Sequence, residues 1–358
     1  MNTMKSERKY YLDNIRWATV ILVVIYHALM LCSGVTPLGI TEEIHIYDSF
    51  MYFVYPWFMM ILFMVSGACT QISLKRNPNH KQFIKKRNVA YLVPSTIGLF
   101  AFQWVQGYLN MLLNHAFETL PDTMPKPIIF LIVCLSGTGV LWYLQVLWVL
   151  SLLLVLVRKI TRQKEISEFP VWGLLLMTIP AIGFALILNT PIITTYRFGI
   201  YGFAFFTGYY LLSNEKLIDD LAKYSVPMMI VSVLMGIFCT VYFWGQNFAD
   251  TSVVSHPFNT AYGWLMSLSI FGMMKKYGNH QTKITAWLTK KNFGLYVFHY
   301  LGISACIYLL DNYTNLPIAV CCLLSLISGF AVGYGLYEII SRIPVLRWCV
   351  LGISKRKE

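Results

Sequence analysis

The sequence predicts an all-α, polytopic integral membrane protein with about ten transmembrane helices. Of its 358 residues, 57% are hydrophobic and only 12% are charged, whereas a typical soluble domain carries about 25% charged residues. The apolar residues form long continuous runs separated by short polar stretches, and a helix that crosses a bilayer needs about 20 such residues. The runs do not alternate apolar with polar residues, as the strands of a membrane β-barrel do.

Ten apolar runs are candidate spans. They lie at about 15–34, 51–73, 89–113, 140–157, 170–189, 198–212, 225–244, 260–274, 292–310 and 316–340. The tract 127–136 (PIIFLIVCLS) is shorter, and we interpret it as a re-entrant or surface segment that leads into the fourth span. We expect a single transmembrane domain over residues 1–344 and a basic cytoplasmic tail over residues 345–358.

The net charge of +12 follows the predicted loops. With ten spans and a cytoplasmic N-terminus, 25 of the 28 Lys and Arg residues fall on cytoplasmic segments, and only Lys126 and Arg197 fall on outer loops. This asymmetry predicts a multi-pass protein of the cell membrane with both termini in the cytoplasm. The expected partners are the lipid bilayer and a polyanionic cytosolic substrate rather than nucleic acid. The sequence does not decide whether the protein forms a homodimer.

The first span contains two polar side chains, Arg16 and His27, in the segment LDNIRWATVILVVIYHALM. They stand eleven positions apart, close to three helical turns, so both fall on nearly one face and about 16 Å apart along the axis. If Arg16 lies at the boundary of a membrane core about 30 Å thick, His27 falls near its middle. An ionisable group in lipid costs roughly 2.5–3.5 kcal/mol, so it usually faces the bundle interior or a water-filled cavity.

Position alone leaves two interpretations of each of these residues. Asp13 precedes Arg16 by three residues and can pair with it on one helical face. Arg16 is then either an ordinary anchor at the membrane boundary or a guanidinium that receives a phosphate or carboxylate. His27 either bonds to a backbone carbonyl of another helix or acts as a general base or nucleophile near pH 7.

The second span and the loop after it carry further candidates. Ser66 and Gly67 allow close helix packing, and a catalytic role is the alternative for Ser66. The loop KRNPNHKQFIKKRNVAYLVP is rich in cations, including Lys85, Lys86 and Arg87. It is either a solvated inner loop or a site that captures a phosphorylated cosubstrate.

Later spans carry polar residues at depth. Trp142 and Gln145 share a face of the fourth span, although Trp142 also suits the outer aromatic belt. Gln103, Gln106 and His299 either make hydrogen bonds between helices or line a substrate pathway. No HExxH spacing, Walker loop or GxGxxG motif is present, so we expect no metal and no bound cofactor.

Four elements in this order resemble the membrane acyltransferase family 3, which O-acylates surface glycans and similar acceptors. The opening span resembles the family's first helix, which starts D-x-x-R and places ten residues between an Arg and a His. PWFMMILFMVSGACTQISLKR resembles its second span, with Ser-Gly before a basic loop. LWYLQVL resembles its Leu-Trp-Phe-Leu element, and GLYVFHYLG resembles its late-helix element with a tyrosine before a histidine. The branch of glucan succinyl-transfer proteins looks closest.

This resemblance implies transfer of an acyl group, of the acetyl or succinyl type, from cytosolic acyl-CoA to a hydroxyl at or beyond the outer face. The family's first-helix Arg and His map onto Arg16 and His27, and its late-helix His maps onto His299. Many members carry Arg-x-x-Arg before a proline in the basic loop. Here Asn88 and Tyr91 occupy the two matching places, and the three cations of Lys85–Arg87 lie just upstream.

These residues suggest a mechanism. The phosphates of acyl-CoA stay on Arg16 and the Lys85–Arg87 cations, while the thioester reaches His27 and the acceptor arrives from the opposite side. His27 is then either a general base or a nucleophile that forms an acyl-imidazole. A proton-coupled transporter and an accessory subunit of glycan export are the competing functions. The sequence does not identify the acyl group or the acceptor.

Overall fold

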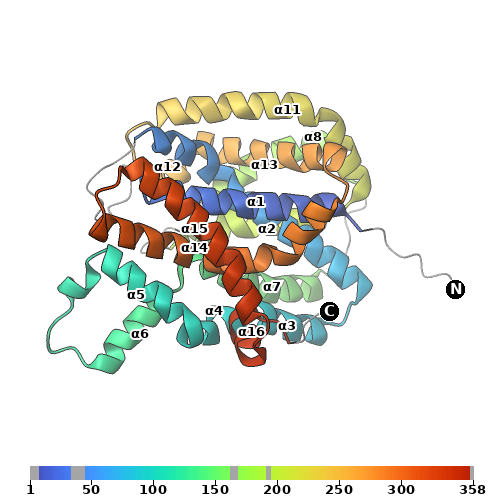
Figure 1. The fold of residues 1–358 in the computed structure, drawn as a ribbon. Coiled ribbons are helices and arrows are strands. Elements are labelled where there is room, and N and C mark those ends of the chain that lie inside the picture. Colours follow the sequence, from blue (N-terminus) through green and yellow to red (C-terminus); the bar gives the residue numbers. More distant parts are fainter. Residues whose placement is uncertain (1–7, 34–44, 162–167, 191–194, 355–358) are drawn as a thin grey trace.

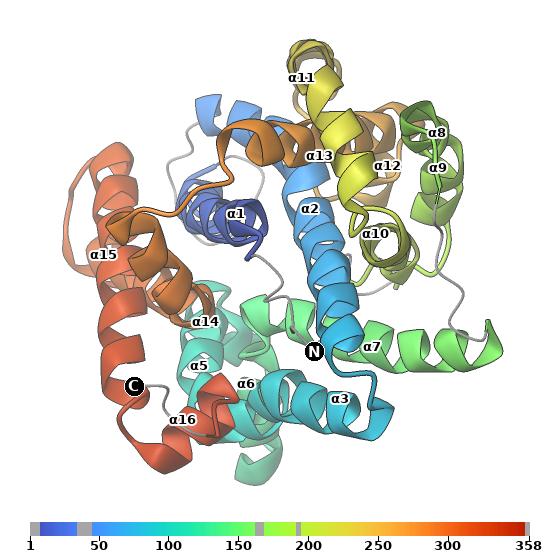
Figure 2. The ribbon, with the colours of Figure 1, turned by 90° about the vertical axis from the view of Figure 1, so that its right-hand side faces the viewer.

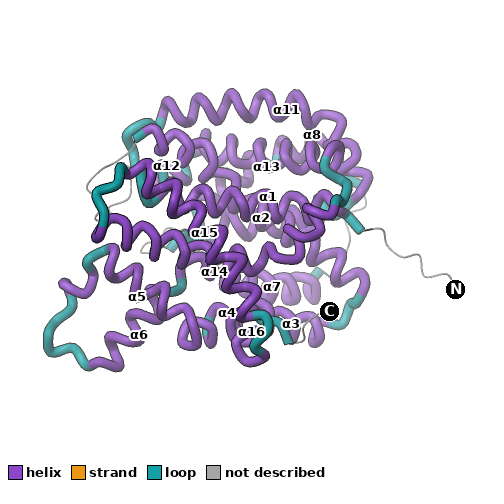
Figure 3. The backbone as a smooth tube through the Cα atoms, in the orientation of Figure 1, coloured by secondary structure: helices purple, strands orange, loops and turns teal. Residues whose placement is uncertain are grey.

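The computed structural model describes residues 8–33, 45–161, 168–190 and 195–354, and this part of the chain is a bundle of helices joined by loops at its two ends (Figure 1 and Figure 3). Six of its helical segments are long and apolar enough to cross a membrane. The predicted all-α membrane fold is thereby confirmed. These helices are α1 (Tyr10–Met30), α2 (Ile46–Arg76), α7 (Trp142–Ile160), α11 (Glu215–Tyr242), α14 (Lys283–Tyr313) and α15 (Ile318–Ile340).

Of the other four predicted spans, two are continuous helices and two are divided. The tract 198–212 forms α10 (Phe198–Tyr210), and 260–274 lies within the longer α13 (Pro257–Tyr277). The tract 170–189 divides into α8 (Val171–Leu176) and α9 (Thr178–Leu186), and the tract 89–113 divides into η1 (Asn88–Leu92), α4 (Val93–Ser95), η2 (Leu99–Gln103) and α5 (Trp104–Leu113).

A proline lies at each of these two interruptions. Pro94 lies within the tract 89–113 and Pro180 within the tract 170–189. Each removes a backbone N–H and brings its ring against the preceding turn, which breaks or kinks a helix. Hydropathy does not register this effect, so the sequence predicted unbroken spans.

The short tract 127–136 is a helix, α6 (Lys126–Ser136), that forms a hairpin with α5. A Cβ on Gly107 would lie 1.8 Å from the Val133 carbonyl oxygen, so the two helices touch backbone to backbone there. The chain then turns through η4 (Gly139–Leu141) into α7, as expected of a segment that leads into the fourth span. The remaining short helices are α3 (His80–Arg87), η3 (Ala116–Thr119) and α12 (Thr251–Val254).

The end of the chain is more ordered than a simple polar tail. Pro344 begins a further helix, α16 (Pro344–Leu351), because proline fits the first turn, where no N–H is needed. Gly352 ends it with φ +61°, and a Cβ there would lie 2.3 Å from the Val89 carbonyl oxygen. Residues 345–354 therefore pack against the broken helix 88–98, while the expected tail residues 355–358 lie outside the described residues.

Helix α1 occupies the middle of the bundle. It packs against α2, α14, α15 and α13. Figure 2 shows it between the pair α14 and α15 on one side and the group α2, α10 and α13 on the other. Helix α11 covers α13 at the periphery. A polar side chain on α1 is therefore surrounded by protein, which is what makes Arg16 and His27 tolerable in an apolar helix.

Two glycines allow α2 and α10 to pack unusually closely. A Cβ on Gly67 would lie 2.0 Å from the Phe205 carbonyl oxygen, and a Cβ on Gly208 would lie 2.0 Å from the Met64 carbonyl oxygen. Only residues without a side chain permit this approach on both helices. The predicted packing role of Gly67 is confirmed.

Ion pairs gather at the end of the bundle where α1 begins. Glu215 pairs with Lys9 and, at 2.6 Å, with Lys275. Lys291 pairs with Glu338 between α14 and α15. Since α1, α11 and α14 all begin at this end, the polar boundary of the bundle is well defined there, and Arg16 lies on the same side.

Candidate active site

Helix α1 connects two cavities. His27 lines a cavity of about 740 Å³ and Arg16 lines a second one of about 340 Å³. Val20 belongs to the wall of the smaller cavity and Val23 to that of the larger one. Because both polar residues share one helical face, as the sequence predicted, each reaches a cavity along the same side of α1.

Helices α1, α2, α7 and α14 line both cavities, and three of them do so in matching order. Along α2, Phe58 and Met59 line the larger cavity and Leu62 and Ser66 line the smaller one. Along α14, Phe293 lines the smaller cavity, Tyr300 lines the larger one, and Tyr296 belongs to both walls. Helix α7 contributes residues to both walls without this order. The cavities are therefore stacked end to end along α1, α2 and α14, with α7 beside both.

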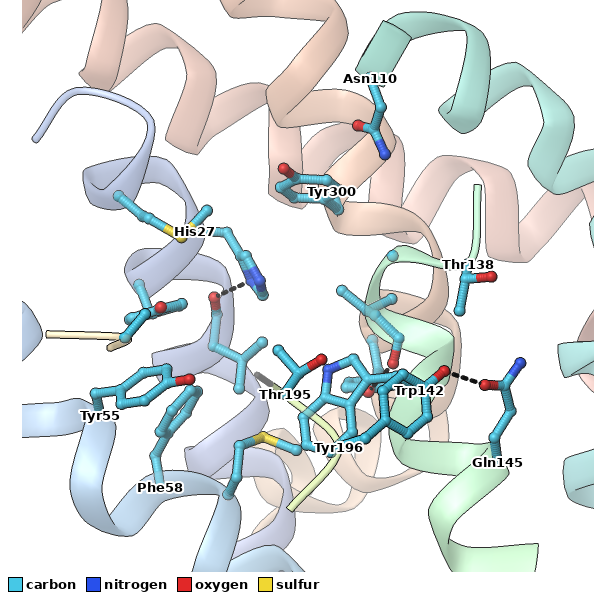
Figure 4. Close-up of a pocket in the computed structure, with 18 of the residues that line it drawn as sticks. His27, Tyr55, Phe58, Asn110, Thr138, Trp142, Gln145, Thr195, Tyr196 and Tyr300 are labelled. Carbon is cyan, nitrogen blue, oxygen red and sulfur yellow. Dashed lines mark hydrogen bonds between the residues drawn. The ribbon is translucent and has the colours of Figure 1, made fainter. Parts of the chain in front are cut away.

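The larger cavity is aromatic and uncharged. Figure 4 shows His27 and Tyr55 on one side of it and Trp142 and Gln145 on the other. The described residues of its wall include no Asp, Glu, Lys or Arg. Its polar groups are the His27 imidazole, tyrosine and threonine hydroxyls, and the amides of Asn110, Gln145 and Asn247.

His27 forms a pair with His299 of α14. The Nδ1 atom of His27 lies 3.1 Å from Nε2 of His299 and 2.9 Å from the Val23 carbonyl oxygen. On the other side of the pair, Nδ1 of His299 lies 3.0 Å from the Leu295 carbonyl oxygen and 2.9 Å from that of Tyr296. His299 is completely buried and lies behind His27.

The partners of these nitrogens determine where the protons lie. Nδ1 of His299 faces two carbonyl oxygens, which accept only, so it carries the hydrogen and Nε2 keeps its lone pair. Nδ1 of His27 faces a carbonyl oxygen and that lone pair, so it also carries a hydrogen. In the neutral ring, Nε2 of His27 is then the basic nitrogen. The arrangement suits proton abstraction or nucleophilic attack by Nε2.

The smaller cavity contains two guanidinium groups, from Arg16 and Arg87. Arg16 donates to the Cys69 sulfur at 3.1 Å and pairs with Asp13 at 3.5 Å. Arg87 donates to the Tyr91 hydroxyl at 2.5 Å and to Thr70. Two guanidiniums on one cavity wall can hold an anion through planar, bidentate hydrogen bonds.

The predicted anion-binding residues divide into two groups. Arg16 and Arg87 line the smaller cavity, whereas Lys85 and Lys86 are exposed on α3 and are not part of its wall. Asp13 also pairs with Arg8 at 2.8 Å and so holds Arg16 from outside the cavity. Consecutive residues at the end of α3 therefore include one partly buried cation in the cavity wall and two exposed ones.

The other predicted residues are distributed between the two cavities. Ser66 lines the smaller cavity and shares a hydrogen bond of 2.8 Å with the Tyr143 hydroxyl. Trp142 and Gln145 line the larger cavity, and Gln145 accepts from the Tyr196 hydroxyl. Trp142 thus belongs to a cavity wall. His299 touches His27 instead of the cavity.

The two glutamines of the third predicted span are buried away from both cavities. Gln106 donates to Asn110 at 2.7 Å and to Ser304 of α14 at 3.1 Å. Neither Gln103 nor Gln106 is part of either wall. The contact with Ser304 is the expected hydrogen bond between helices.

Tyrosines are the functional candidates that sequence reasoning missed. Tyr143 and Tyr296 stand between the cavities, and Tyr300 and Tyr201 line the larger one. Tyrosine makes up 23 of the 358 residues, so no single one stood out. The adjacency of Tyr143 to Trp142, and of Tyr296 and Tyr300 to His299, was the available signal. Within the described residues, no group of three or more His, Cys, Asp or Glu is placed to hold a metal ion.

Comparison with known proteins identifies the family. Residues 9–335 match the acyltransferase 3 family, whose description is an acyltransferase domain. The match covers most of the chain, so the protein belongs to this family and is a membrane acyltransferase. No curated protein and no solved structure matches the chain. Family membership favours the acyltransferase interpretation over a carrier or an accessory subunit.

Proposed function

We propose that this acyltransferase moves an acetyl or succinyl-type group from acyl-CoA on the cytoplasmic side to a hydroxyl of a glycan, or of a similar acceptor, on the outer side. The observation that carries the proposal is the stacking of two chemically different cavities along one set of helices. One cavity has two guanidiniums and the other has an imidazole without charged neighbours.

The smaller cavity suits the donor. Acyl-CoA is a polyanion, and Arg16 and Arg87 offer two cations that converge on one space. Lys85 and Lys86 are exposed close by on α3 and can draw the anion toward the cavity through their field. Arg87 lies one position before Asn88, so it can stand in for the first arginine of the usual family pattern.

The larger cavity suits a neutral, hydroxylated acceptor. A charged acceptor would lose its hydration on entering this cavity, and the cavity wall has no counter-ion to compensate for that loss. The rings of Trp142, Tyr196 and Tyr201 offer flat apolar faces, and Gln145 and Asn110 offer amide donors and acceptors. Alternating apolar faces and hydroxyls are the surface of an uncharged sugar, so this lining supports a glycan acceptor.

His27 is the proposed catalytic residue, acting through Nε2. As a general base it removes the proton of the acceptor hydroxyl while the oxygen attacks the thioester carbon and the C–S bond breaks. As a nucleophile it first takes the acyl group itself and releases the thiolate, and the hydroxyl then displaces the imidazole. In both routes His299 and the Val23 carbonyl hold the ring through Nδ1.

The proposed orientation is supported by the charges. The end of the bundle where α1 begins holds Lys9, Lys275 and Lys291 in ion pairs, and the smaller cavity lies toward that end. A cytoplasmic location of this end agrees with the excess of Lys and Arg in the predicted inner segments. The acyl group would then enter from the cytoplasm and leave on the outer side.

Purified protein in lipid nanodiscs tests the proposal. Labelled acetyl-CoA and succinyl-CoA are supplied with membrane glycans, and mass spectrometry searches for one added acyl mass on the acceptor. We expect consumption of one of the two donors and its loss in His27→Ala. The control variant His280→Ala changes an exposed histidine in the loop before α14 and should retain activity. Full acyl transfer by His27→Ala would refute the role of His27.

A further inference from the structure

Two tyrosines, which we call the tyrosine wall, stand where the two cavities approach each other. Tyr296 lines both cavities, and Tyr143, 5.8 Å away between ring centroids, lines the smaller one. Helix α7 contributes Trp142 to the larger cavity and Tyr143 to the smaller one, so adjacent residues face opposite sides of this wall. Arg16 and His27 lie on opposite sides of it.

Both tyrosines are held by their hydroxyl groups. The Tyr143 hydroxyl shares a hydrogen bond of 2.8 Å with Ser66 and donates to the Leu62 carbonyl oxygen at 3.2 Å. The Tyr296 hydroxyl donates to the Val140 carbonyl oxygen. The Tyr143 ring also packs edge-on against Phe63, with centroids 4.8 Å apart. These bonds fix each ring across the line that joins the cavities.

The wall matters because the reaction needs both sides at once. A thioester carbon must come within about 3.5 Å of the attacking atom, whereas Arg16 and His27 are about 16 Å apart along α1. A donor anchored on Arg16 therefore reaches Nε2 of His27 only when the tyrosine wall moves aside. A permanent opening would also let water from the larger cavity reach the thioester.

We propose that Ser66 and Tyr143 form a latch that keeps the tyrosine wall closed between the donor and acceptor cavities, and that they are positioning residues which limit loss of the acyl group to water. This inference rests on the proposed function for its meaning in catalysis. In the reaction that the latch limits, water attacks the thioester carbon, the C–S bond breaks, the thiol leaves with a proton, and the free acid is released.

The first test measures hydrolysis of acyl-CoA without acceptor. Tyr143→Phe keeps the ring and removes both hydrogen bonds, and Ser66→Ala removes one. Since one hydrogen bond corresponds to about a two- to tenfold change in an equilibrium, we expect hydrolysis to rise about two- to tenfold in each variant. The double variant should match Tyr143→Phe alone, because both changes remove the same bond.

The second test does not depend on catalysis. Cys69 lines the smaller cavity, so a small charged methanethiosulfonate added on the His27 side must pass the wall to reach it. Labelling of Cys69, located by peptide mass spectrometry, should be slow in the unmodified protein. It should accelerate about two- to tenfold in Ser66→Ala and Tyr143→Phe, by the same hydrogen-bond argument.

Tyr262→Phe is the matched control. Its hydroxyl donates to the Phe53 carbonyl oxygen on α2 at 2.5 Å, as Tyr143 donates to Leu62, but Tyr262 lines neither cavity. We expect its hydrolysis and labelling rates to equal those of the unmodified protein. If Tyr262→Phe raised these rates as much as Tyr143→Phe does, the latch would be overturned, because loss of any tyrosine hydrogen bond would then produce the same increase.

The outcomes separate the two proposals. Unchanged Cys69 labelling in folded Ser66→Ala and Tyr143→Phe would overturn the latch, whatever the enzyme assay shows. Faster labelling in a protein that consumes no acyl-CoA would support the latch and refute the proposed function. Size-exclusion chromatography and labelling from the Arg16 side establish that each variant is folded.

Discussion

The Nε2 atom of His299 lies 3.1 Å from the Nδ1 atom of His27, although 272 positions separate them in the chain. Because carbonyl oxygens hold the hydrogen on His299 Nδ1, Nε2 of His299 acts as an acceptor, and with the Val23 carbonyl oxygen it keeps a hydrogen on Nδ1 of His27 and leaves Nε2 of His27 as the basic nitrogen. A residue outside the cavity wall thereby helps to set which nitrogen is reactive.

Removal of the contact between His299 and His27 should lower kcat strongly and change the KM for acyl-CoA only slightly. In His299→Leu the ring of His27 loses a hydrogen-bond acceptor. If the lost bond contributes about 1–2 kcal/mol to holding the ring in its reactive orientation, kcat should fall about five- to thirtyfold. The KM for acyl-CoA should change less than twofold. In His299→Gln the side-chain oxygen can still accept from Nδ1, so activity should be largely rescued. Equal defects in both variants would mean that His299 has only a packing role.

His27→Ala should have the largest effect of any single substitution in the cavities. Loss of a general base typically lowers the rate about 10²- to 10⁴-fold, and loss of a nucleophile leaves no covalent route. Single-turnover assays with labelled acyl-CoA distinguish the two routes, because only a nucleophile yields protein-bound label before acceptor is added. Residual activity above one tenth of the unmodified rate would contradict the assignment.

Arg87 and Lys86 should behave differently although they are adjacent. Arg87 lines the smaller cavity and Lys86 is exposed. Because a charge-assisted hydrogen bond contributes about 1.5–3 kcal/mol, Arg87→Gln should raise the KM for acyl-CoA at least tenfold. Lys86→Gln, the matched control, should raise it less than threefold, and this smaller effect should disappear in high salt. Similar effects in both variants would indicate a general field rather than a site.

Trp142→Leu should separate acceptor use from donor use. The indole lies in the larger cavity, with its ring centroid 5.5 Å from that of Tyr201 and 6.2 Å from that of Tyr196. Loss of one stacking face is worth about 0.5–1.5 kcal/mol, so the KM for acceptor should rise about two- to tenfold. The KM for acyl-CoA should remain within twofold. A rise confined to the donor KM would place the acceptor elsewhere.

Gly67→Val should destabilise the fold without touching the chemistry. A Cβ there would lie 2.0 Å from the Phe205 carbonyl oxygen, so α2 and α10 must separate. Overpacking of this kind costs about 1–3 kcal/mol, which should appear as a lower midpoint of thermal unfolding in detergent. Gly183→Ala is the control, because a Cβ there has no neighbour within 4 Å. Equal midpoints for both variants would contradict the close packing.

The sequence by itself determined that the protein lies in a membrane and that its fold is helical. Long apolar runs, and few Lys and Arg residues outside the expected inner segments, were sufficient to predict a helical membrane protein, since the bilayer admits only closed hydrogen-bonded structures. The distance of eleven positions also placed Arg16 and His27 on one face of α1, because helical geometry depends on the local chain alone. These properties follow from composition and periodicity, and the structure retains them.

The tertiary structure decided which residues meet. Three features depend on how α1, α2, α7 and α14 pack: His299 faces His27, Arg87 but not Lys86 lines the cavity of Arg16, and Tyr143 and Tyr296 stand between two cavities. Periodicity gives the face of each helix but not its neighbour or its rotation, because these are set by side-chain packing between segments far apart in the chain. The prolines that divide two predicted spans act through backbone geometry, to which hydropathy is insensitive.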